Sequence, residues 1–245
     1  MPLLPPPFSN QPLSDWIAQL QQSASAEDRV RALQAIGVLG SPLEVVAWAL
    51  NAVRDTDSTV RALAAKQLGA IEASEAVETQ LVSLLDDVDP DVKFEAARAL
   101  VRAKSQQSIL TVPVFLTFLD ETETHPLMVA AVVNTLVKID LPPQTTMEGL
   151  RPRLQRLLNH ERAAVREAVS SAFVKWPAMG ASCVDQLLPL LDDNEPVVRE
   201  NIAKSLGESG VTNDAIRAAL QTASQDEDVE VARAANDALQ RLDAR

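Results

Sequence analysis

One apolar pattern occurs seven times along this chain of 245 residues. Each copy begins at a valine or methionine and continues with apolar or small residues three, four, seven, eight and eleven positions later, the spacing of one buried stripe on an α-helix. The copies begin at Val30, Val60, Val92, Met128, Val165, Val198 and Val231, with successive spacings of 30, 32, 36, 37, 33 and 33 residues. A helix repeated at such a period predicts a solenoid built from similar units.

The residues before these helices favour a helix start. An aspartate that can cap the first free amides lies three positions before the start of three copies, at Asp57, Asp89 and Asp228. A proline lies two positions before the start of three copies, at Pro90, Pro126 and Pro196. Another helical stretch lies upstream of each turn, for example at residues 75–86, 182–192 and 214–223. Each unit is therefore expected to be a first helix, a short acidic turn and a second helix.

Such a helix pair cannot bury both of its apolar faces alone, so consecutive pairs should stack on one another. We predict an all-α fold, an α-solenoid of about seven stacked helix pairs. Residues 14–245 would form a single repeat domain whose first pair spans 14–22 and 29–39, and residues 1–13 a Pro-rich N-terminal extension that is extended or disordered. Pro113 and the connector 141–144 interrupt the pattern, so we expect the stacking to change near the fourth and fifth units.

The composition excludes several classes of protein. A chain that is 47% apolar, with no tyrosine and few other aromatic residues, is typical of helices packed through small side chains. Its one cysteine excludes a disulfide framework and a zinc site built from cysteines. With neither an apolar run that could cross a bilayer nor a signal-peptide pattern at its start, the protein is expected to be cytoplasmic. The net charge of −12 weighs against a general nucleic-acid binder.

Three stretches, residues 57–69, 89–100 and 195–207, resemble HEAT repeats, and more narrowly the short HEAT-like repeats of phycobilisome lyases. The resemblance covers nearly the whole chain from about residue 14. It implies a right-handed superhelix in which the second helices line the concave surface and the first helices the convex one. Because this repeat serves scaffolds, adaptors, bilin lyases and DNA-repair glycosylases alike, it does not specify one function.

Candidate catalytic groups are scarce. Both histidines, His125 and His160, fall in turns before second helices, where capping or solvent exposure explains them better than catalysis or metal binding. Cys183 has no basic neighbour in sequence, so a packing role is favoured over a reactive thiolate. Acidic pairs such as Asp86-Asp87 recur in equivalent turns, which favours capping over acid–base chemistry. We therefore predict no catalytic residue, no metal site and no cofactor.

Charge divides unevenly between the two helices of a unit. The seven second helices carry thirteen basic and five acidic residues, whereas the rest of the chain is strongly acidic. The predicted protein-binding groove combines cations with an exposed apolar patch: Lys66, Lys93, Phe94, Arg98, Val129, Val133, Arg166 and Lys204. Two alternatives remain open. Arginines directly after the start residues, at Arg31, Arg61, Arg166 and Arg199, can instead pair with acidic turns and tie repeats together, and Phe94 can be buried by a neighbouring unit.

These observations favour a non-enzymatic scaffold or adaptor that holds a segment of another protein, with acidic and apolar residues, on its concave face. The narrower resemblance implies an alternative, a bilin lyase or phycobilisome-handling factor. A HEAT-like nucleic-acid binder is a third possibility, supported only by the charge of the groove. Neither a membrane nor a small molecule is expected as the partner.

Overall fold

A computed structural model describes residues 8, 11–71, 74–120 and 124–244. Within these ranges the regular elements are helices, and no strand occurs. None of the described helices combines the length and the apolar character needed to cross a bilayer. The chain divides into two compact units, Met1–Phe115 and Leu116–Arg245, with the boundary inside the helix at residues 112–120. The predicted N-terminal extension lies mostly outside the described residues, and the single repeat domain stays a prediction.

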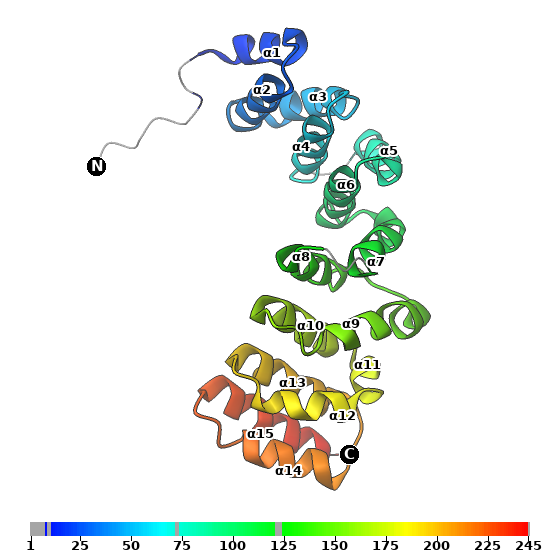
Figure 1. Cartoon of the computed structure of the whole chain (residues 1–245), viewed down its shortest axis with the longest axis vertical. Coiled ribbons are helices and arrows are strands. Elements are labelled where there is room, and N and C mark those ends of the chain that lie inside the picture. The colour runs from blue at the N-terminus through cyan, green and yellow to red at the C-terminus, as the bar shows by residue number, and fades with distance from the viewer. Residues whose placement is uncertain (1–7, 9–10, 72–73, 121–123, 245) are drawn as a thin grey trace, which may run out of the picture. The chain divides into compact units, whose positions relative to one another are not determined.

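The first unit is built from helix pairs (Figure 1). Its helices are α1 (Leu13–Gln22), α2 (Ala26–Leu39), α3 (Pro42–Ala52), α4 (Ser58–Leu68), α5 (Glu75–Ser83), the 3-10 turn η1 (Leu84–Asp86), α6 (Pro90–Arg102), η2 (Gln106–Thr111) and the start of α7 (Val112–Asp120). The second helices α2, α4 and α6 pack against one another in series, and each also packs against the first helix of its own pair. This is the stacking that the repeat period predicts.

The second unit continues the same alternation (Figure 1). It contains the rest of α7, α8 (Pro126–Leu136), the π-helical segment η3 (Thr145–Leu150), α9 (Arg151–Leu157), α10 (Ala163–Lys175), α11 (Pro177–Ala181), α12 (Val184–Leu187), η4 (Leu188–Asp192), α13 (Pro196–Glu208), α14 (Asp214–Ala223) and α15 (Val229–Asp243). The second helices α8, α10, α13 and α15 form its series of packed helices. The fifth and sixth first helices are irregular, because one begins as a π-helix and the other is split into α11, α12 and η4.

Local capping explains where the second helices start. Asp57 accepts hydrogen bonds from the amides of Thr59 and Val60, and Asp89 and Asp228 cap α6 and α15 in the same way. The first helical residue of three second helices is a proline, at Pro90, Pro126 and Pro196. The predicted helix starts are therefore confirmed at these repeats.

The first repeat corrects the predicted register. Ser25 caps α2, which begins at Ala26 rather than at residue 29. The position that Val60 occupies in α4, three residues after the cap, is occupied in α2 by Asp28, and Val30 is only half-buried. Counted from Asp28, the first spacing is 32 residues, in line with the next. The choice of the nearest valine as the start residue was wrong by two positions.

Candidate functional site

Among the described residues, four arginines of the second helices form bidentate ion pairs with aspartates in the following repeat. In each pair the arginine Nε and Nη2 bond the two carboxylate oxygens at 2.6 to 2.9 Å. The pairs are Arg29–Asp55, Arg61–Asp87, Arg166–Asp193 and Arg199–Asp226. We call this set the arginine ladder; each arginine lies four residues after the cap of its helix.

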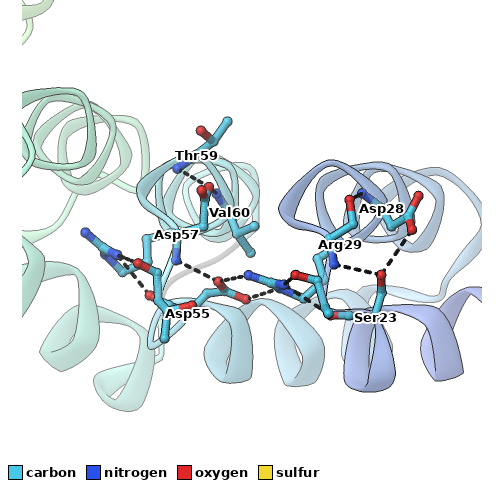
Figure 2. Close-up of polar contacts among 11 residues, drawn as sticks. Ser23, Asp28, Arg29, Asp55, Asp57, Thr59 and Val60 are labelled. Atoms are coloured by element: carbon cyan, nitrogen blue, oxygen red, sulfur yellow. Dashed lines mark hydrogen bonds and ion pairs between the residues drawn. The ribbon is translucent and has the colours of Figure 1, made fainter.

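The ladder also fixes the turns on both sides of each second helix. The remaining nitrogen of Arg61, Nη1, donates to the carbonyl oxygens of Asp55 and Thr56, in the turn that precedes its own helix. Asp87 Oδ1 accepts the amide of Asp89, the cap of the next helix. Figure 2 shows the same arrangement one repeat earlier, with Arg29 between Ser23 and Asp55. Hydrogen bonds from Arg61 lower the pKa of Asp87 below its usual value, despite partial burial.

The ladder confirms the alternative in which arginines of the second helices pair with acidic turns. It also corrects the predicted binding site, which included Arg166. Arg61, Arg166 and Arg199 tie repeats together as that alternative proposed, so Arg166 is a structural residue with its guanidinium engaged. Arg31 does not take part: Arg29 holds its place, and the Arg31 guanidinium lies 5.8 Å from the centre of the Trp16 ring.

The predicted apolar patch is not exposed. Phe94 is 3% exposed, because its ring packs edge-on against Phe115 of α7 at 6.2 Å and the Arg98 guanidinium covers it at 5.4 Å. Val129 and Val133 are buried within α8, which packs against α10. Val133 lies eight residues after the helix cap, where Ala65 and Ala97 are buried as well. The expectation of an exposed hot spot at these residues was wrong, because the assumed exposed positions belong to the core.

The other predicted cations have different surroundings. Lys66 is exposed and Lys93 half-buried, and neither forms an ion pair with any carboxylate that the structure describes. Arg98 pairs with Glu95 at 3.1 Å, and Lys204 pairs with Glu200 at 2.5 Å, each within its own helix rather than with an acidic turn. Lys66, Arg98 and Lys204 all lie nine residues after the caps of their helices, so they hold one repeat position.

In the first unit, the positions six, nine and thirteen residues after the helix cap lie on one face of each second helix, and they are exposed or half-buried. Four basic residues hold such positions, and we call them the cationic stripe: Arg31, Lys66, Arg98 and Arg102. Arg31, Lys66 and Arg102 are exposed and form no ion pair among the described residues. The acidic residues on this side, Glu27, Asp91 and Glu95, lie in the first two turns of α2 and α6, so the cations dominate its C-terminal half.

A pocket of about 610 Å³ opens at the C-terminal end of this stripe in the first two repeats. Its lining comes from α2, α3, α4 and the segment before α1: Phe8, Gln34, Gly37, Val38, Gly40, Pro42, Val45, Gln67, Ala70 and Ile71. The apolar pattern includes Ile71, eleven residues after Val60, but it does not predict a pocket, because it marks residues expected to face the core. The sequence feature that could have revealed the pocket is Gln67, a long polar residue at a position where the other second helices carry Ala, Ser or Thr.

The residues considered for catalysis have structural roles. His125 Nδ1 accepts the amide of Leu127 and caps α8, and His160 Nδ1 accepts the amide of Arg162, the residue that precedes α10. Cys183 is buried, with Gln155 Nε2 at 3.0 Å from its sulfur. These contacts agree with a capping role for His125 and a packing role for Cys183, and they place His160 in the turn before α10.

The sequence profile of HEAT repeats matches residues 13–100, 78–172 and 150–240. Similar solved structures include an engineered protein with a TM-score of 0.68, 21% identity, and coverage of 94% of this chain and 68% of that one. Another is a computationally designed armadillo repeat protein for modular peptide recognition, with a TM-score of 0.60, 18% identity, and coverage of 80% and 99%. A third is the complex of CpcE and CpcF of phycocyanin lyase from Nostoc sp. PCC7120, with a TM-score of 0.50, 21% identity, and coverage of 98% and 99%. No curated protein matches the chain in sequence.

Proposed function

This chain belongs to the HEAT-repeat family, and we propose that it is a non-enzymatic cytoplasmic scaffold or adaptor that holds a segment of another protein. The segment would lie across the second helices of the first unit. The observation that carries this proposal is the cationic stripe, in which Arg31, Lys66 and Arg102 remain exposed and without a described carboxylate partner. Charge complementarity therefore favours a partner segment with acidic residues.

The contrast with the arginine ladder supports a separate role for the stripe. Ladder arginines such as Arg61 are mostly buried and use all their donor nitrogens within the fold. Lys66 and Arg102 of the stripe make no such contact with a described residue, so their charge is available to a partner. A chain with a net charge of −12 that keeps exposed cations on one side presents a local site for an acidic ligand.

Affinity capture with charge-reversed variants tests the proposal. The double variant Lys66→Glu with Arg102→Glu changes the stripe, and Arg54→Glu with Lys104→Glu makes the same charge change at exposed residues outside it. We expect extract from the cells that make the protein to yield a bound protein with the wild type and the control variant, but not with the stripe variant. Retention of the same proteins by all three chains would contradict the proposal.

Bilin handling is a second candidate. It is favoured by the likeness to the complex of CpcE and CpcF of phycocyanin lyase, which extends over 98% of this chain. Absorbance of biliverdin titrated with the purified protein tests it. A saturable change in the bilin spectrum supports this candidate, and an unchanged spectrum rejects it.

Nucleic-acid binding receives less support. The stripe positions carry no aromatic side chain on which a base can stack, and Trp16 is buried beneath Arg31. If an oligonucleotide binds at all, its affinity should fall steeply with added salt and show no sequence preference. A sequence-specific complex that survives physiological salt would favour this candidate over the scaffold.

A further inference from the structure

The pocket of the first unit arises from one exception to the repeat. Ten residues after the cap, the second helices carry a small, buried residue that lets neighbouring helices approach: Ala35, Ala99, Thr135, Ala172, Ser205 and Ala238. In α4 this position is occupied by Gln67. A side chain of this length cannot be accommodated by the close packing that the small residues permit.

Glycines on the preceding helix show how the junctions differ. A Cβ atom added to Gly69 would lie 2.5 Å from the Cα of Ala99, and one added to Gly207 would lie 2.8 Å from the Cα of Ala238, so these helix backbones are in contact. At the α2–α4 junction the equivalent glycine is Gly37, and an added Cβ would lie 2.5 Å from Nε2 of Gln67. The glutamine side chain thus fills the space where the backbones meet elsewhere, and the pocket opens beside it.

The hydrogen bonding of Gln67 is incomplete. Its Nε2 donates to the carbonyl oxygen of Leu33 at 2.7 Å, which fixes the orientation of the amide. Its Oε1 is buried and accepts no hydrogen bond from any described residue. A buried acceptor without a donor destabilises a fold, so Gln67 gives the pocket an acceptor that a bound N–H group would satisfy.

The walls of the pocket are mostly apolar. Phe8, Val45 and Ile71 line it, and Val38, which is 56% exposed, extends the apolar surface toward solvent. Phe8 is held in place by Trp16, whose ring packs edge-on at 5.7 Å and whose Nε1 donates to the Phe8 carbonyl oxygen. The pocket therefore suits one apolar side chain carried by an extended segment that continues over the surface.

The charges beside the pocket are mainly positive. Arg31 lies one helical turn before Gln34, which lines the pocket, and Lys66 directly precedes Gln67. On the other side is Glu44 of α3, whose carboxylate accepts hydrogen bonds from the amide and hydroxyl of Ser41 and completes the cap of that helix. Two exposed cations without an ion pair to any described residue, Arg31 and Lys66, thus lie next to residues that line the pocket.

We infer that this pocket receives one apolar side chain of an acidic partner segment, which donates a backbone N–H to Gln67 Oε1 and places carboxylates near Arg31 and Lys66. This inference rests on the proposed function and names the part of the partner that the stripe would hold.

Defined peptides provide the test. Fluorescein-labelled peptides Asp-Glu-X-Glu-Asp, with X as Ala, Leu, Ile, Phe or Trp, are titrated with the full chain, and anisotropy is recorded. A peptide with a large apolar X should bind about thirtyfold more tightly than the alanine peptide. N-methylation of the amide of X should weaken the best peptide about tenfold, because the donor to Gln67 is lost. Replacement of its acidic residues by lysine should abolish binding.

Two substitutions at Gln67 separate the pocket from its acceptor. Gln67→Ala restores the small residue of the other repeats, so the chain should stay folded by thermal melting while binding of the best peptide falls at least about tenfold. Gln67→Met keeps the side-chain length without the acceptor, so the methylated and unmethylated peptides should bind it equally well. Gln221→Ala, at an exposed position of α14, should leave binding unchanged.

Equal affinity for every X, or unchanged binding by a folded Gln67→Ala variant, would overturn the inference. Biliverdin binding that is lost in Gln67→Ala, with no peptide bound by the wild type, would overturn it too and assign the pocket to a small ligand. Failure of the proposed function can be distinguished from failure of this inference. If stripe reversal releases the captured partner and Gln67→Ala does not, the inference is wrong and the proposed function stands; if stripe reversal changes nothing, the proposed function fails.

Discussion

Arg61 of α4 and Asp87, in the turn before α6, form a bidentate ion pair in which both nitrogen–oxygen distances are 2.8 Å. The same guanidinium holds the turn before its own helix through the carbonyl oxygens of Asp55 and Thr56. Each such arginine therefore sets the geometry between one repeat and the next. It follows that the ladder arginines maintain the fold, whereas the role that we propose for the cationic stripe is to bind a partner.

The first prediction concerns the stability that the ladder contributes. Arg61→Ala leaves a largely buried carboxylate and two carbonyl groups without their donor, so the free energy of unfolding should fall by about 2 to 3 kcal/mol in urea denaturation. Arg233→Ala, which removes an exposed pair with Glu230 within one helix, should cost less than about 0.5 kcal/mol. Equal losses in the two variants would show that the ladder is no more than a surface feature.

The second prediction concerns pH. Hydrogen bonds from Arg61 and Arg199 lower the pKa of Asp87 and Asp226 in the folded chain, so the unfolded chain binds protons at a higher pH than the folded one. Their contribution should be complete above the ordinary aspartate pKa of about 3.9 and lost as pH falls through the lower folded value. Melting temperature measured from pH 6 to pH 2.5 checks this. Asp87→Asn should flatten the decline at acid pH, and an unaltered slope would mean that this carboxylate does not contribute.

The third prediction concerns Phe94. As a core residue packed on Phe115, its replacement by alanine should lower the free energy of unfolding by about 3 to 5 kcal/mol. Val88→Ala, at an exposed position six residues before Phe94 and just before α6, should change it by less than about 0.5 kcal/mol. Chemical denaturation of both variants measures the difference. A Phe94→Ala chain as stable as the parent would restore the exposed hot spot that the sequence suggested.

Features of the fold that depend on residues close in sequence, or on a repeated spacing, can be predicted from the sequence, whereas contacts between residues far apart in sequence cannot. The repeat period, the caps at Asp57 and Asp89 and the ladder at Arg61 are encoded within a few residues or recur at a fixed spacing, so pattern reading finds them. The burial of Phe94 depends on Phe115, which lies 21 positions further along the chain in the first helix of the next repeat. No local pattern marks that contact. The register of the first repeat was missed because Val30 resembles a start residue, whereas the cap is Ser25.

The candidate site was harder to predict than the fold. The sequence placed Lys66 and Arg98 correctly at one repeat position, because helix periodicity alone determines it. The pocket at Gln67 depends instead on a mismatch between neighbouring helices, seen only when Gly37 and Gln67 are compared with Gly69 and Ala99. A search for residues that recur in every repeat gives no weight to a single exceptional residue such as Gln67.

The fourth prediction concerns the close contact between α4 and α6, of the kind that Gln67 replaces between α2 and α4. Gly69→Ala would place a methyl group against the backbone of Ala99, so the chain should lose about 1 to 3 kcal/mol of stability. Gly149→Ala meets only a methyl of Leu116 at 3.7 Å within a helical segment and should be neutral or stabilising by up to about 1 kcal/mol. Urea denaturation of the two variants provides the comparison. A tolerated Gly69→Ala would contradict the account of how these helices pack.

Hydrogen exchange of the chain, alone and with the protein it captures, locates the surface that the partner covers. If an acidic partner segment crosses the cationic stripe and enters the pocket, amide exchange should slow in the C-terminal turns of α2 and α4 and through residues 69–71. The first helix α5 should exchange as before, and in α3 only the N-terminal turn, which lines the pocket through Pro42 and Val45, should slow. Slowing confined to α3, α5 or the second unit, with residues 34–39 and 66–71 unchanged, would contradict the assignment of the binding surface.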